Sequence, residues 1–170
     1  MASDVETVEP AGADLAPQLD AVEPNYKNVL RVRMGIFWLI LWIGGAICDQ
    51  AFLRGTPVYG LPSLGVPILA LAALATAPRR IYDRLRYSLT ERLLRVVRGW
   101  LFHVDTVVPL VRVQHIDVTR GPLEKMFGVA TLVVHTAGTH NSVVTLPGLS
   151  PERAAEIRDI IREHVRTDFA

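Results

Sequence analysis

The spacing of hydrophobic residues divides the chain into regions of different character. Residues 34–52 read MGIFWLILWIGGAICDQAF, an almost unbroken apolar run. A helix needs ~20 apolar residues to cross the ~30 Å hydrocarbon layer of a bilayer. Residues 61–77, LPSLGVPILALAALATA, form a slightly shorter apolar run, whose helix would have to include flanking residues to span the bilayer. The pattern therefore predicts two transmembrane helices.

The segment between the two runs is short and has the composition of a turn. Residues 53–60, LRGTPVYG, contain glycine and proline and a single cation, Arg54. The predicted helices must therefore form a hairpin. Cations are concentrated at the other end of this hairpin, so the positive-inside rule places both termini in the cytoplasm. The cations that flank the hairpin are Lys27, Arg31, Arg33, Arg79, Arg80, Arg84 and Arg86.

Two polar residues, Asp49 and Gln50, fall in the last turn of the first predicted helix. A charge there costs much less than the ~2.5–3.5 kcal/mol estimated for the bilayer centre. We therefore expect both side chains to lie at the membrane surface, and the alternative is a polar contact with another helix or a partner chain. Gly44 and Gly45, in the same run, would permit a neighbouring helix to approach closely.

After residue 77 the apolar residues recur at every second position. Leu85, Tyr87 and Leu89 fall on one face of a predicted strand, and Arg84 and Arg86 fall on the other. Several short strands separated by turn residues are typical of an antiparallel sandwich or barrel. Further strands are expected over residues 93–98, 101–108, 111–119, 129–136 and 142–146.

The last element is predicted to be an amphipathic helix. Ser150, Pro151 and Glu152 provide a helix cap, a proline at the first helical position and an acidic residue in the first turn. Strands followed by one covering helix predict an all-β domain of pleckstrin-homology type, made of two packed antiparallel sheets and a C-terminal helix. The apolar stripe of this helix comprises Ala154, Ile157, Ile160, Ile161 and Val165.

Four motifs carry a resemblance to a known family. They are YSLT at residues 87–90, VPLVRVQ at 108–114, the glycine-bounded segment at 121–128 and TAG at 136–138. With them, residues 27–166 resemble the bacterial pleckstrin-homology-like membrane proteins of the YdbS-like group. Lys125 departs from the pattern, where arginine is commoner. The resemblance implies the fold, a bacterial inner-membrane location, and oligomerisation or pairing with a larger relative that carries the same domain.

These observations divide the chain into three parts. Residues 1–26 are acidic and lack hydrophobic periodicity, so we expect a disordered tail. Residues 27–80 form the transmembrane hairpin, and residues 81–167 form the cytoplasmic domain. A net charge of only +1 argues against a nucleic-acid partner, and the single cysteine, Cys48, excludes an intrachain disulfide.

Catalytic and metal sites find little support in the sequence. His115 and His135 fall in neighbouring predicted strands, but no zinc-binding motif surrounds them and no nucleophile motif is present. A metal-dependent hydrolase that uses these two histidines is therefore the least favoured alternative. We expect no enzyme activity, no metal and no cofactor.

Two sets of residues are candidates for binding. The cations next to the membrane could bind anionic lipid headgroups or an acidic partner, or could serve topology alone. The segment at 121–128 is expected to place Leu123, Met126 and Phe127 in the core, and the alternative is a partner-docking loop that also uses Lys125. The cations in question are Arg79, Arg80, Arg84 and Arg86.

The function that the sequence favours is that of a non-catalytic, membrane-anchored scaffold. Its partners would be membrane lipids and either a second copy of the chain or a related membrane protein. Recognition of anionic headgroups through the four arginines is the main alternative.

Overall fold

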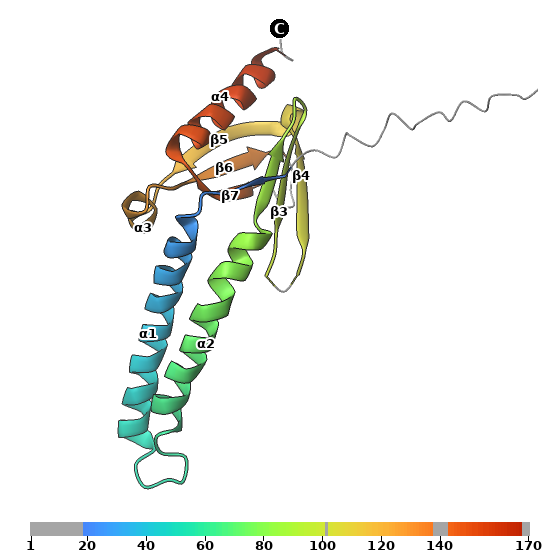
Figure 1. Cartoon of the computed structure of the whole chain (residues 1–170). Coiled ribbons are helices and arrows are strands. Elements are labelled where there is room, and N and C mark those ends of the chain that lie inside the picture. Colours follow the sequence, from blue (N-terminus) through green and yellow to red (C-terminus); the bar gives the residue numbers. More distant parts are fainter. Residues whose placement is uncertain (1–18, 101, 138–142, 168–170) are drawn as a thin grey trace, which may run out of the picture.

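A long helical hairpin projects from a small β-domain in the computed structural model (Figure 1). The structure describes residues 19–100, 102–137 and 143–167. Helices α1 (Tyr26–Phe52) and α2 (Leu61–Arg84) lie side by side. Within their most apolar stretches only 6% and 11% of the residues are buried in the protein, whereas a core helix of a soluble protein is mostly buried. These surfaces therefore face lipid, and the prediction of a transmembrane hairpin is confirmed.

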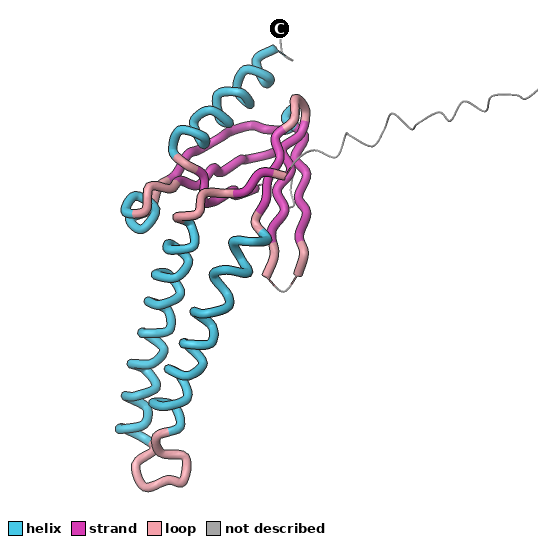
Figure 2. The backbone as a smooth tube through the Cα atoms, in the orientation of Figure 1, coloured by secondary structure: helices cyan, strands magenta, loops and turns pink. Residues whose placement is uncertain are grey.

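Within the described residues, seven short strands form two antiparallel sheets (Figure 2). The order is β1-β2-β3-β4 in the first sheet and β5-β6-β7 in the second. A short helix, α3, joins β5 to β6, and α4 follows β7 at the C-terminal end. The bounds are β1 (Asp20–Ala21), β2 (Arg86–Leu89), β3 (Leu93–Arg98), β4 (Val104–Pro109), the 3-10 turn η1 (Leu110–Arg112), β5 (Val113–Thr119), α3 (Pro122–Met126), β6 (Ala130–Thr136), β7 (Val143–Leu149) and α4 (Pro151–Thr167).

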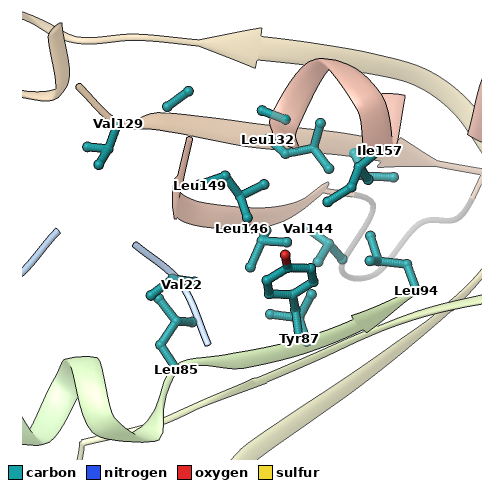
Figure 3. Close-up of a cluster of buried hydrophobic side chains, with 14 of the residues drawn as sticks. Val22, Leu85, Tyr87, Leu94, Val129, Leu132, Val144, Leu146, Leu149 and Ile157 are labelled. Carbon is teal, nitrogen blue, oxygen red and sulfur yellow. The ribbon is translucent and has the colours of Figure 1, made fainter. Parts of the chain in front are cut away.

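The core lies between the two sheets and under α4 (Figure 3). Alternate residues of each strand point inward, as the period of two requires. Leu94 and Tyr87 come from the first sheet, Leu132 and Leu146 from the second, and Ile157 from α4. All five are buried, so the predicted fold class, with two packed sheets and a covering helix, is confirmed.

Helix α4 begins as predicted. The backbone N–H of Arg153 donates to Oγ of Ser150 at 3.2 Å, so Ser150 caps the helix and Pro151 is its first residue. Ile161 is buried, but Ile160 is 36% exposed, and its predicted place in the buried stripe is wrong. Residue 160 lies one position, or about 100°, around the helix from Ile161 and falls at the margin of the buried face. The side chain of Val165 lies outside the described residues.

The predicted tail, residues 1–26, is wrong at its C-terminal end. Asp20 and Ala21 form strand β1, which pairs with β2 at the edge of the first sheet. Val22 is 2% exposed, and its carbonyl oxygen accepts a hydrogen bond from Tyr82 Oη at 3.0 Å. Backbone pairing with β2 and the burial of Val22 thus give residues 20–22 a defined structure, although their sequence shows no hydrophobic periodicity. Residues 1–18 lie outside the described residues.

Several element boundaries also differ from the sequence prediction. Helix α2 continues past residue 77 to Arg84, because its last turns pack on the β-domain, where Tyr82 is buried. Strand β4 begins at Val104 rather than at residue 101. Residue 101, the predicted turn at Gly138 and the predicted strand start at residue 142 lie outside the described residues.

Candidate functional site

The hairpin and the β-domain share one hydrophobic core at their junction. Tyr26, Val29 and Leu30 of α1 belong to the same buried cluster as the strands. The ring of Tyr26 lies directly on Gly148 of β7, where a Cβ would be 2.7 Å from Tyr26 Cγ. Gly148 also has φ +81°, which favours glycine. Its carbonyl oxygen accepts a hydrogen bond from the N–H of Glu23 at 2.7 Å, which fixes the chain just before α1.

The second helix is attached at the same junction. Tyr82 is 8% exposed and holds Val22 through its hydroxyl group. The ammonium group of Lys27 lies 4.1 Å from the centroid of the Tyr82 ring, a cation–π contact between the two helices. Leu85, the residue after α2, is already in the core. The β-domain is therefore packed against the hairpin, and its orientation relative to the helices is set by buried contacts.

The four candidate arginines do not form one cluster. Arg79 and Arg80 are exposed on the last turns of α2, and the Arg79 side chain is 80% exposed with its Nε 3.8 Å from the Asp83 carboxylate. Arg84 donates from Nη1 to the carbonyl oxygen of Trp100 at 2.8 Å. Arg86 lies on β2, and its Nη1 is buried without a hydrogen-bond partner among the described atoms. Arg79 and Arg80 are thus exposed on α2 alone, whereas Arg84 and Arg86 are engaged at the β-domain.

The segment at 121–128 is a compact loop around α3. The Glu124 carboxylate accepts hydrogen bonds from the N–H of Gly121 and from Thr131 Oγ1, both at 2.7 Å. Leu123 and Phe127, four residues apart, pack against the core as predicted. The helix also contacts α1, so the loop lies on the hairpin side of the domain (Figure 1).

Two side chains of this loop point away from the core. Met126 is 76% exposed, so the prediction that it plugs the core is wrong. Position 126 lies about 60° around the helix from residue 123 and about 100° from residue 127, at the margin of the inward face, where the short helix leaves its side chain uncovered. Lys125 is exposed as well. Both residues are therefore placed where the partner-docking alternative requires them.

The two strand histidines meet, as their positions in neighbouring strands suggested. His115 and His135 are directly opposed on β5 and β6, with ring centroids 5.9 Å apart. Asp117 lies between them, 2.9 Å from His115 Nε2 and 3.6 Å from His135 Nε2. The side chains are 68%, 38% and 45% exposed for His115, His135 and Asp117. Over the described ranges no three or more His, Cys, Asp or Glu side chains are arranged to hold a metal. The arrangement is a solvated cross-strand cluster.

A polar groove lies between β5 and α4, at the end of the domain away from the hairpin (Figure 1). Its volume is about 530 Å³. Strand β5 is an edge strand, because within the described residues it pairs with β6 alone. Sequence reasoning missed the groove, because its two walls are far apart along the chain. The lining residues are Val113, Gln114, His115, Ile116, Asp159, Arg162 and Glu163.

At the loop end of the hairpin, Asp49 joins the two helices. Its side chain is 1% exposed and accepts hydrogen bonds from the N–H of Gly60 at 3.2 Å, the N–H of Ser63 at 3.0 Å and Ser63 Oγ. These N–H groups belong to the residue before α2 and to its third residue, so Asp49 of one helix caps the N-terminus of the other. For Asp49 the structure shows the alternative, a polar contact with the other helix, whereas Gln50 bonds to Tyr59 and Arg54 at the loop. Gly45 faces Pro62 closely, whereas nothing lies near Gly44.

An all-β domain with a C-terminal helix, packed on a transmembrane hairpin, defines the class of membrane-anchored PH-like proteins. The chain matches the bacterial PH domain family over residues 38–165 and belongs to that family. It is 37% identical over 148 residues to the transmembrane protein YdbS of Bacillus subtilis (strain 168), a match that covers 85% of this chain and 91% of the relative. No solved structure matches the chain. The resemblance to the YdbS-like group is confirmed.

Proposed function

We propose that this protein is a non-catalytic module that assembles partner proteins at the cytoplasmic face of the bacterial inner membrane. The observation that carries the proposal is the shared core of hairpin and β-domain. Because the domain is packed against the helices, it presents the groove between β5 and α4 away from the bilayer at a set height and angle. A surface held in this way restricts the orientations in which a partner can bind, which lowers the entropic cost of assembly.

The charge distribution supports a cytoplasmic domain. The exposed cations Arg79 and Arg80 lie at the domain end of the hairpin, together with Lys27, while the loop end carries only Arg54. By the positive-inside rule the domain end faces the cytoplasm. Because β1 pairs with β2, the segment before α1 and the segment after α2 lie next to each other, at the same end of the hairpin.

The partner best suited to the groove is a second copy of this chain or a related PH-like membrane protein. An edge strand can accept a strand from another chain through backbone hydrogen bonds. The groove carries charges of both signs, with Asp159 and Glu163 near Arg162. Mixed charges of this kind suit a self-complementary contact between related surfaces.

The test compares two charge reversals in the full-length protein. Arg162→Glu changes the groove, and Arg120→Glu makes the same change at an exposed position outside it. The protein is extracted from membranes in mild detergent and its complexes are weighed by native mass spectrometry. We expect wild type and Arg120→Glu to carry a second chain, and Arg162→Glu to lose it. A wild-type protein extracted as a single 18.8 kDa chain would refute the proposal.

A second candidate function is recognition of anionic lipid headgroups, favoured by the exposure of Arg79 and Arg80. The test uses full-length protein in nanodiscs that contain phosphatidylglycerol among zwitterionic lipids. Lipids retained after partial delipidation are identified by mass spectrometry. Selective retention that is lost in Arg79→Gln/Arg80→Gln, but kept in an Arg92→Gln control, supports this function. Equal retention of both lipids removes it.

A further inference from the structure

Two exposed aromatic residues lie at the turn between β3 and β4. Trp100 is 50% exposed and Phe102 is 79% exposed. Large aromatic side chains are among the most costly to leave in water, so a pair of them on one turn indicates a binding surface. Figure 1 shows that the end of β3 and the start of β4 extend beside α2, toward the loop end of the hairpin.

The turn is held against the end of the transmembrane helix. Arg84 is the last residue of α2, and its Nη1 donates to the carbonyl oxygen of Trp100 at 2.8 Å. On the other side of the turn the chain is tightly closed, because a Cβ at Gly99 would overlap the carbonyl oxygen of Phe102. Trp100 is therefore held next to the point where α2 leaves the membrane, and Phe102 lies close by.

The residue types at this turn match the boundary between headgroups and acyl chains. Tryptophan concentrates at that boundary, since its ring is apolar and its N–H can reach water, and phenylalanine adds apolar area. Exposed cations stand nearby, because Arg79 and Arg80 lie on the last turns of α2 and Arg84 contacts the turn itself. Cations close to an anionic leaflet are attracted to it.

We propose that Trp100, which follows β3, and Phe102, which precedes β4, insert into the headgroup region of the same leaflet that α2 enters. The lipid surface is the favoured occupant because β3 contacts α2 and Trp100 is bonded to Arg84, the last residue of that transmembrane helix. The domain would then be attached to the membrane at three places, namely at α1, at α2 and at this turn. This attachment does not depend on the proposed assembly function.

The test measures the depth of Trp100 by fluorescence. The chain has three tryptophans, and Trp38→Phe/Trp42→Phe leaves Trp100 as the only one. The full-length variant is reconstituted into vesicles of phosphatidylethanolamine and phosphatidylglycerol, with or without lipids brominated near the headgroup. We expect bromolipid to reduce Trp100 emission at least twofold, and iodide in the aqueous phase to have little effect.

A matched control places the single tryptophan elsewhere. In a variant with all three tryptophans replaced by phenylalanine, Val111→Trp puts the ring at another exposed site, in η1, 63% exposed in wild type. This ring should be quenched by iodide and not by bromolipid. If Trp100 behaves like the tryptophan at position 111, or is shielded from both quenchers by a protein partner, the proposal is overturned.

A second measurement covers the case in which the tryptophan variants do not fold. Phe102→Cys in a Cys48→Ala background carries a single spin label, since Cys48 is the only cysteine. In the same vesicles, a label in the bilayer interface is more accessible to oxygen than to a water-soluble nickel complex. The reverse order at position 102 would contradict insertion.

Discussion

The two ends of the hairpin are fastened by different kinds of interaction. At the domain end, buried apolar side chains join the hairpin to the β-domain. Tyr26 lies on Gly148, and Tyr82 and Leu85 belong to the core of the β-domain. At the loop end, the buried contact is polar, because the Asp49 carboxylate caps α2. The same pair of helices thus changes its mode of attachment from one end to the other.

The difference follows from the surroundings of each end. In water, burying apolar area is favourable at roughly 25 cal/mol per Å². Between helices in lipid this driving force is missing, because the acyl chains are as apolar as the side chains they would replace. Helix contacts there use small residues and hydrogen bonds, as at Gly45 against Pro62 and at Trp42, whose Nε1 donates to the carbonyl oxygen of Ser63 at 2.9 Å.

The largest effect is expected from truncating Tyr26. Tyr26→Ala removes a buried ring from the junction and should lower the free energy of unfolding of the β-domain by about 3 kcal/mol, by analogy with other aromatic truncations. The measurement is urea unfolding of the full-length protein in mild detergent, followed by near-ultraviolet circular dichroism. Tyr59→Ala makes the same change at the loop end, where the ring is 49% exposed, and should cost under about 1 kcal/mol. If Tyr26→Ala and Tyr59→Ala lowered the free energy of unfolding equally, the two ends of the hairpin would not differ in their mode of attachment.

A Cβ at position 148 should destabilise the junction in two ways. Gly148→Ala combines an unfavourable backbone conformation with a clash against the Tyr26 ring, for a total of about 2 kcal/mol in the same unfolding assay. Gly128→Ala is the control, because its φ is +67° but nothing lies within 4 Å of the added Cβ. It should show the backbone cost of about 1 kcal/mol alone. The excess at position 148 should vanish in a Tyr26→Ala background.

Asp49→Ala should weaken the loop end and leave the domain intact. Loss of the carboxylate frees the N–H groups of Gly60 and Ser63, so we expect faster hydrogen exchange in residues 60–63 and unchanged exchange in β6. Asp49→Asn keeps an acceptor oxygen, so its exchange rate in residues 60–63 should lie between those of wild type and Asp49→Ala. The β-domain should unfold at the wild-type urea concentration, and a lower midpoint would show that the two ends are coupled.

The smallest effect concerns an ion pair outside both ends. Hydrogen bonds from Arg95, at 3.0 Å from its Nε, hold the pKa of the Asp105 carboxyl below its ordinary value. A lowered pKa in the folded state adds stability above the ordinary carboxyl pKa, and this contribution is lost as the pH falls through the folded-state value. Asp105→Asn should therefore unfold slightly more easily than wild type at pH 7. The difference should disappear at strongly acidic pH, and a constant difference would exclude this linkage.

Much of the fold could be predicted from local patterns. The apolar runs predicted both spans, the alternation of Leu85, Tyr87 and Leu89 predicted a strand, and Ser150 predicted the start of α4. Each of these signals is contained within a few consecutive residues. Strand β1 gave no such signal, because two residues in an acidic segment cannot show a period. Its structure depends on pairing with β2, which lies more than 60 residues further along the chain.

The surfaces were less predictable than the elements. The charge of Asp49 suggested a place at the membrane surface, but its burial depends on how the loop brings Gly60 and Ser63 back toward α1. The β5–α4 groove and the position of Trp100 next to Arg84 likewise depend on contacts between distant segments. Spacing along the chain carries no information on such contacts, so the groove and the surface around Trp100 could be found only in the structure.

Strand β1 also couples membrane insertion to folding. It precedes the first helix, yet it pairs with β2, which follows the second. If only one helix crossed the bilayer, residues 20–22 and the rest of the sheet would be on opposite faces of the membrane. The edge of β2 and the Tyr82 hydroxyl would then lack their partners. The β-domain can therefore be completed only when both helices cross the membrane, so that the segments before α1 and after α2 lie on the same side.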